Sequence, residues 1–286
     1  SISAGEDTYG NVKNKQNTIG LGHRHIWNQN AYSSTSISIS KQNANAIFYE
    51  NQSDTVNLST NDIFKTLNAR QINHIQFNKT LSSVFGFEIQ NRNLEYDFLL
   101  NNVNSKNDVL VTNLSSFITI KSILVKKALI SIGSRIDWND FERDILIAPR
   151  INVDFSLSKG WGNLIINSGK YFQNPPEKYL SVVEKNDLRS INTIQHSLTF
   201  EKLITSSTKF SISVYEKKYD NAPMMERNQI FTDPTFLLDQ LRTYRNIVSN
   251  GKAKTSGVEV LIEKKRSTNF YGLIGGSIYK SIYNDQ

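Results

Sequence analysis

Two closely spaced histidines are the residues best suited to bind a metal. His23 and His25 stand two positions apart, and in an extended strand such residues share one face. Two imidazoles on one face are compatible with metal or haem capture. No third ligand can be placed beside them from the sequence, since His74 and His196 are distant. We therefore favour two polar residues on a water-facing strand surface.

An acidic run offers a second set of possible ligands. Asp137, Asp140, Glu142 and Asp144 carry carboxylates that could hold a divalent cation. The run lacks the glycine and the spacing of a calcium loop, so a solvated acidic loop is the better interpretation. The sequence also contains no glycine-rich phosphate loop, no Gly-x-Ser-x-Gly and no paired His–Glu metal motif. Because the histidines are dispersed, we predict a protein that is not an enzyme and has no cofactor or metal.

Alternation with period two dominates the chain and must position any such groups. In 151–157 every odd residue is apolar and every even one polar, and clear alternation recurs in 85–92, 130–138, 210–215 and 257–263. One face of such a strand prefers an apolar environment and the other prefers water. The polar face carries charges in mid-strand, which the core of a soluble sandwich would not accept without partners. These charges are Glu88, Arg92, Arg135, Asp137, Glu259 and Glu263.

The pattern predicts about twelve strands and almost no helix. The strands are expected near 16–27, 31–48, 63–78, 82–95, 109–122, 126–138, 146–158, 162–172, 190–203, 208–219, 254–264 and 269–280. Short connections alternate with long ones, the long ones near 52–62, 93–108, 139–145, 173–189 and 220–253. Short turns on one rim and long loops on the other are typical of an up-and-down outer-membrane barrel. The predicted fold class is therefore all-β, an antiparallel up-and-down transmembrane β-barrel.

Composition agrees with this class and excludes others. The 286 residues have 38% hydrophobic residues and a mean hydropathy of −0.42, and no apolar run is long enough for a spanning helix. The chain has no cysteine, which excludes disulfides and thiolate metal sites. A net charge of +7 raises the question of nucleic acid, but the lysines are scattered and no basic helix accompanies them. We therefore predict no nucleic-acid partner.

Special residues fit strand ends and loops. All five prolines are expected at strand starts or in loops, because a central strand cannot spare the N–H that proline lacks. Trp27 and Trp161 fall beside short turns and Trp138 at a far strand end, an arrangement that favours two aromatic girdles. The only helices expected are short ones at 177–183 and 236–245.

Several stretches carry a resemblance to a known family. They are 148–158 (APRINVDFSLS), 168–176 (SGKYFQNPP), 214–223 (VYEKKYDNAP), 251–260 (GKAKTSGVEV) and 270–281 (FYGLIGGSIYKS). In this order and spacing they resemble the middle of the barrel of TonB-dependent outer-membrane receptors, and the Asn- and Lys-rich composition is similar to Bacteroidota members. Before residue 146 the resemblance is limited to the barrel rhythm.

The resemblance implies active uptake of a scarce nutrient, such as a siderophore, cobalamin, glycan or peptide, across the bacterial outer membrane. Family members carry an N-terminal plug domain that engages TonB, and neither the plug nor the TonB box is recognisable here. Plugged transporters have about 22 strands. Residues 1–286 are therefore interpreted as one barrel segment, incomplete at both ends, while a complete twelve-stranded barrel remains possible. The implied partners are outer-membrane lipid, TonB through a plug outside this segment, and a surface lipoprotein or other envelope proteins.

Candidate ligand contacts lie in one long loop and on the polar strand face. External loops of the size of 221–250 usually capture ligand. The candidate residues are Arg227, Phe231, Tyr244 and Arg245 in this loop, and Arg92 and Arg135 on the polar face. Three other functions stay open: a passive porin with an inward constriction loop, a barrel subunit of a larger envelope or secretion assembly, and a soluble secreted β-protein.

Overall fold

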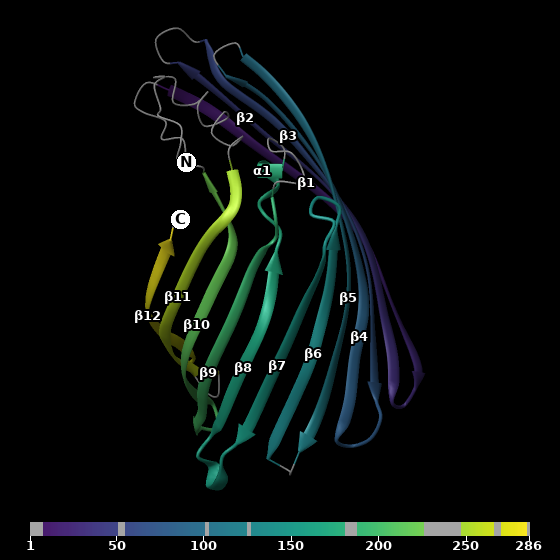
Figure 1. The fold of residues 1–286 in the computed structure, drawn as a ribbon, viewed down its shortest axis with the longest axis vertical. Helices are drawn as coiled ribbons and strands as arrows, with labels where there is room; N and C mark the ends of the chain where they lie inside the picture. The colour runs from purple at the N-terminus through teal and green to yellow at the C-terminus, as the bar shows by residue number, and fades with distance from the viewer. Residues whose placement is uncertain are drawn as a thin grey trace.

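In a computed structural model the chain forms one curved sheet of twelve antiparallel strands, in which each strand pairs with its neighbours in sequence (Figure 1). The structure describes residues 8–50, 55–100, 103–124, 127–180, 188–225, 247–265 and 270–284. Within these residues β1 pairs with β2 alone and β12 with β11 alone, so the sheet has two edges. The predicted fold class, an all-β antiparallel up-and-down arrangement, is confirmed.

The strands run between 11 and 22 residues, longer than the five or six usual in soluble sheets. Their bounds are β1 Thr8–Asn28, β2 Ala31–Glu50, β3 Val56–Gln76, β4 Leu81–Leu100, β5 Val103–Leu124, β6 Ala128–Asn139, β7 Ile145–Ser156, β8 Asn163–Gln173, β9 Ile191–Thr205, β10 Thr208–Met225, β11 Ile247–Lys264 and β12 Gly272–Asn284. A 3-10 turn covers Ser158–Gly160, and helix α1 covers Glu177–Leu180.

The two faces of the sheet differ as the alternation predicts. The outer face exposes large apolar side chains, such as Phe87 (57% exposed), Ile132 (58%) and Ile147 (55%). The inner face, on which α1 lies, carries the charged positions (Figure 1). The apolar rows do not meet each other in a sandwich core, and an exposed apolar face of this extent needs a lipid or protein partner. None of the helices in the described part of the chain is long and apolar enough to cross a membrane.

Two predicted long connections are wrong. Residues 56–62 belong to β3, residues 93–100 to β4 and residues 103–108 to β5, which leaves only 51–55 and 101–102 between the strands. These segments are rich in Asn, Ser and Asp, which sequence propensity assigns to loops. Pairing with long neighbouring strands extends them instead, because each added residue satisfies backbone hydrogen bonds of the ladder.

The expectation that every proline lies at a strand start or in a loop is also wrong. Pro149 is the fifth residue of β7, and Pro223 lies near the end of β10, where the register with β11 shifts. Pro223 is tolerated because a bulge leaves a residue out of the ladder. The predicted helix at 177–183 is confirmed over Glu177–Leu180. The one expected at 236–245, and Pro234, lie outside the described residues.

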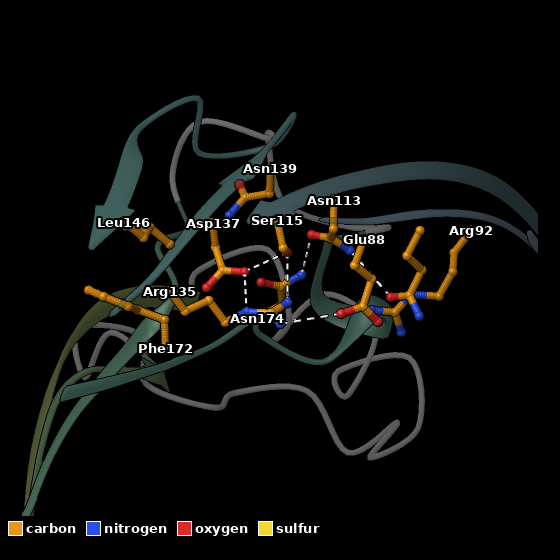
Figure 2. Close-up of a pocket in the computed structure, with 11 residues that line it drawn as sticks. Glu88, Arg92, Asn113, Ser115, Arg135, Asp137, Asn139, Leu146, Phe172 and Asn174 are labelled. Carbon is orange, nitrogen blue, oxygen red and sulfur yellow. Dashed lines mark hydrogen bonds and ion pairs between the residues drawn. The ribbon is translucent and has the colours of Figure 1, made fainter. Parts of the chain in front are cut away.

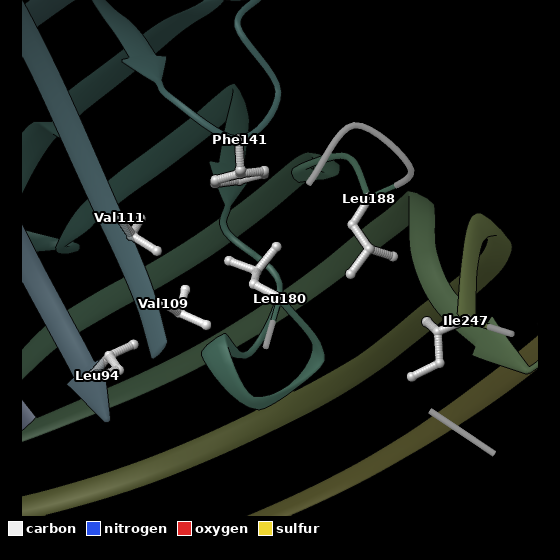
Figure 3. Packing of buried hydrophobic residues seen from close by; sticks show 7 residues of the cluster. All are labelled: Leu94, Val109, Val111, Phe141, Leu180, Leu188 and Ile247. Atoms are coloured by element: carbon white, nitrogen blue, oxygen red, sulfur yellow. The ribbon is translucent and has the colours of Figure 1, made fainter. Parts of the chain in front are cut away.

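An apolar cluster on the inner face holds the β8–β9 connection against the wall (Figure 3). Leu180 in α1 and Leu188 before β9 pack with Val109 and Val111 of β5 and are at most 4% exposed. Phe64, Tyr96 and Tyr179 pack against the cluster. The described parts of the connection, Glu177–Leu180 and residue 188, therefore lie against the inner face of the sheet. The inner cluster consists of Leu94, Val109, Val111, Phe141, Leu180, Leu188 and Ile247.

Candidate lumenal site

Strand pairing assembles a charged row across the inner face. Glu88 of β4 pairs with Ser115 of β5, Ser115 with Asp137 of β6, and Asp137 with Leu146 of β7. Since side chains alternate between faces, four residues in one register row project to the same side of the sheet. The next row places Arg135 opposite Phe117 and Ala148. The site is thus built by consecutive strands, although its residues span 59 positions from 88 to 146.

Arg135 organises the charges in this row (Figure 2). Its Nε donates to Asp137 Oδ1 at 2.7 Å, one terminal nitrogen donates to Glu88 Oε2 at 3.2 Å, and the other donates to Ser115 Oγ at 2.7 Å. The three charged side chains are between 23% and 29% exposed. The planar guanidinium fork can satisfy several acceptors at fixed angles, which a lysine cannot do. One cation between two carboxylates leaves this cluster with a surplus negative charge.

Amide side chains surround the charged cluster. Asn174, which follows β8, donates from Nδ2 to Asn113 Oδ1 at 2.8 Å, so the start of the β8–β9 connection reaches across to β5. Gln90 donates to Asn68 at 2.9 Å. Each amide offers both donors and an acceptor. Such a lining suits a ligand with hydroxyl, amide or carbonyl groups, and it does not favour a ligand of one particular charge.

A cavity of about 280 Å³ lies among these residues. This is near the lower end of the roughly 300–1,000 Å³ usual for small-molecule pockets, so it can hold a small ligand or one part of a larger one. We call it the lumenal pocket. Its lining consists of Glu88, Gln90, Arg92, Asn113, Ser115, Arg135, Asp137, Asn139, Leu146, Phe172 and Asn174.

The inward fold of the β8–β9 connection is fixed by polar bonds beside the pocket. Asn139 is 1% exposed and its Nδ2 donates to Ser190 Oγ at 3.3 Å. The backbone N–H of Ser190 donates to Glu142 Oε2 at 2.9 Å, and the N–H of Glu142 donates to Asn139 Oδ1 at 2.8 Å. These bonds tie the start of β9 to the turn between β6 and β7. The connection is therefore held at both ends, by Asn174 and by Ser190.

The predicted ligand contacts are only partly within the described residues. Arg92 and Arg135 both line the lumenal pocket, although 43 positions separate them in the sequence. The other four candidates lie in 226–246, outside the described residues. Sequence reasoning missed the amides of the pocket. The only signal available for them was their odd or even position along a strand. This position predicts which face of the sheet a residue lies on, but not which residue of the neighbouring strand it pairs with. The four candidates outside the described residues are Arg227, Phe231, Tyr244 and Arg245.

The two metal candidates lie where the sequence predicts, on one strand and in or beside one turn: His23 and His25 are in β1, and the acidic run lies at the end of β6 and in the turn after it. Arg24 pairs with Ser34 of β2, and Ser36, two residues further along β2, pairs with Arg70 in the next inner row. Arg24 therefore lies on the inner face, and its neighbours His23 and His25 lie on the outer face. Both residues are exposed, and the ring of His25 packs edge-on against Trp27 with 4.2 Å between the ring centres. In the acidic run, Asp137 binds Arg135, Asp140 accepts from the N–H of Thr112 at 3.1 Å, and Glu142 binds Ser190. Within the described residues no group of three or more His, Asp or Glu could hold a metal.

An apolar outer face around a polar inner face defines the wall of a membrane β-barrel. The comparisons make this specific: residues 2–285 match the family described as "TonB dependent receptor-like, beta-barrel". The chain belongs to this family. Comparison with curated protein sequences gives no match.

Solved structures of similar fold are outer-membrane receptors and transporters. The copper transporter OprC superposes with a TM-score of 0.73 at 10% identity, covering 97% of this chain and 50% of that one. The ferripyoverdine receptor of the outer membrane of Pseudomonas aeruginosa gives 0.75 at 12% identity, with 94% and 41% covered. The ferric yersiniabactin uptake receptor FyuA from Yersinia pestis gives 0.70 at 12% identity, with 96% and 43% covered. The chain thus spans half or less of the length of these structures, and the protein is an outer-membrane protein.

Proposed function

We propose that this chain is part of the wall of a TonB-dependent receptor, of Bacteroidota type, that actively imports a scarce nutrient. Family membership supports the receptor class, and the lumenal pocket carries the proposal for this chain. The pocket joins hydrogen-bonding amides to the charged cluster around Arg135, beneath a connection that folds inward. This arrangement can hold a polar ligand, and nothing in it calls for catalysis.

In the proposed mechanism, external loops capture the ligand and the inner wall receives it. The loop residues Arg227, Phe231, Tyr244 and Arg245 make the first contacts, and Arg92 and Arg135 contact the ligand in the lumen. A plug domain in another part of the polypeptide fills the lumen until TonB pulls on it. Residues 1–286 then form one barrel segment of a wall of about 22 strands. A surface lipoprotein is a further proposed partner.

The chemistry of the pocket narrows the ligand class. Its amides match the hydroxyl, amide and carbonyl groups of siderophores, glycans, peptides and the side chains of cobalamin. Two arginines and two acids line the pocket together, so the lining is close to charge-balanced. We therefore propose a ligand held mainly by hydrogen bonds in this part of the lumen.

A passive porin is the second candidate, because the β8–β9 connection folds inward as a constriction loop would. The two functions differ in their need for energy. Uptake of labelled ferric siderophores, cobalamin, oligosaccharides and peptides should be measured in cells that express the whole gene product, with and without TonB. We expect uptake of one class to require TonB and to fall in the Arg135→Ala variant. Uptake that persists without TonB and rises linearly with concentration would establish the porin instead.

A third candidate, a barrel subunit of a larger envelope assembly, is tested in the same cells. Stable co-purification of the same partners in every preparation, together with no uptake of any class, would favour it. The two sheet edges at β1 and β12 are where further strands would pair.

A further inference from the structure

The wall contains a break between β7 and β8. Pairing of these strands ends at Arg150 opposite Gly169, although β7 begins five residues earlier, at Ile145, and β8 continues four residues further, to Gln173. Over these residues β7 still pairs with β6, and β8 still pairs with β9. Figure 1 shows the two strands separating towards the end of the sheet where α1 lies. Two adjacent strands of the wall are thus left without a ladder between them.

Pro149 gives the break a chemical cause. The N–H of Ser156 donates to the carbonyl of Lys127 on the β6 side. The register of β7 with β6 has no shift, so even residues of β7 direct their backbone groups to β6 and odd residues direct theirs to β8. Pro149 is the first odd residue beyond the last pair, and it has no N–H to donate. The ladder to β8 therefore loses a donor at the position where the pairing ends.

The lumenal pocket extends into this break. Leu146 is on the inner face, in the row of Asp137. Tyr171 lies on the inner face as well, because it is two residues beyond Gly169, and Gly169 pairs with Arg150. The ring of Tyr171 also lies 5.0 Å from the Arg150 guanidinium. Alternation then assigns Phe172 to the opposite face, yet Phe172 and Leu146 line one cavity (Figure 2). The cavity consequently reaches the gap between β7 and β8.

On the outer face, apolar side chains flank the break on the β6–β7 side, while Lys170 lies on the β8 side with its Nζ 4.8 Å from the Phe172 ring. Ile136, Ile145 and Ile147 lie on the outer face beside it and are 43%, 69% and 55% exposed. A protein of the outer membrane presents such residues to acyl chains. Leu146 and Phe172 are the two apolar side chains of the lining, and Leu146 is the register partner of Asp137 in the charged cluster.

We propose that an acyl chain of the surrounding bilayer enters the break and lies between Leu146 and Phe172. The break is then a lateral lipid-binding site that joins the membrane to the lumenal pocket. An apolar chain is the occupant that matches the side chains of Leu146 and Phe172 and the exposed isoleucines on the β7 side, because water there would leave apolar surface hydrated. The inference depends on the location of the protein in the outer membrane and not on the proposed uptake.

Fluorescence quenching in proteoliposomes tests the proposal with the whole gene product. These 286 residues have no cysteine, so Leu146→Cys adds a single thiol to this part of the protein for an environment-insensitive fluorophore, and any cysteine elsewhere in the gene product is replaced by serine. Lipids brominated on the acyl chain quench on contact, and iodide quenches from water. Ile147→Cys on the outer face is the lipid-exposed control, and Ser36→Cys, on the inner face of β2 away from the break, is the lumenal control. Phe172→Cys repeats the measurement from the other strand and serves if Leu146→Cys fails to fold.

The two controls set the scale. We expect brominated lipid to quench the label at 146 or 172 about half as strongly as at 147 and about fivefold more than at 36, since alternate residues of a membrane strand are otherwise shielded from lipid. Iodide should quench the label at 36 but not at 146. Quenching at 146 by iodide alone would mean that water fills the break. Quenching by neither agent would mean that protein fills it, and either result overturns the proposal.

Discussion

The docking of the β8–β9 connection can be tested by removing one side chain from the inner cluster. Leu188 is fully buried, at 0% exposure, and packs in the cluster with Leu180 and Phe141. Truncating a buried leucine to alanine costs about 2–5 kcal/mol. Leu188 lies before β9 and outside every strand ladder. The loss should therefore fall on the equilibrium between the docked and undocked connection, and the strand ladders should remain.

The expected size of the effect follows directly. At about 1.4 kcal/mol per factor of ten, Leu188→Ala should raise the undocked population about 30-fold to about 4,000-fold. Arg189 is exposed, but its backbone N–H donates to Ser249 Oγ at 2.9 Å. The rate of trypsin cleavage after Arg189 reports the undocked population when the connection docks again faster than it is cleaved. The matched control is Leu110→Ala, on the same strand as Val109 but on the outer face.

Two results would refute this reasoning. If Leu188→Ala resists trypsin as well as the parent protein while the barrel stays folded by heat-modified gel mobility, the cluster does not hold the connection. If Leu110→Ala accelerates cleavage as much as Leu188→Ala, the effect comes from general weakening of the wall. Conductance in planar bilayers gives a second measurement, because an undocked connection leaves the lumen wider.

Two further substitutions test the wall itself. Arg135→Ala should destabilise the folded barrel by about 1–3 kcal/mol in denaturant unfolding from vesicles, because two neighbouring carboxylates lose their shared cation. Arg135→Lys should recover only part of this stability. Full recovery by lysine would show that the planar geometry of the guanidinium is unimportant. Gly86→Ala should lower the free energy of unfolding by about 1–3 kcal/mol, because its Cβ would lie 2.8 Å from the Phe117 ring and closer still to a backbone carbonyl. Gly22→Ala, whose Cβ meets nothing within 4 Å, should leave the free energy of unfolding nearly unchanged. Equal effects of the two substitutions would contradict the close contact.

The resemblance seen in the sequence and the fold agree because they rest on the same local pattern. Period-two alternation identified twelve strands and assigned Glu88 and Arg135 to the polar face before any pairing was known. Strand ends were less predictable. The polar residues at the start of β3 and at the meeting of β4 and β5 have weak strand propensity, and only the ladder of a long neighbour holds them extended.

The sequence by itself determined which side of the wall each residue faces, because that depends on a backbone geometry that repeats every two residues. Only the tertiary structure decided which residues meet. The contacts of Arg135 with Glu88, of Asn174 with Asn113 and of Leu188 with Val109 join positions 47 or more apart. They depend on register and on the inward fold of the connection, which are set by summed packing and hydrogen bonding across many strands and have no local signature in the chain.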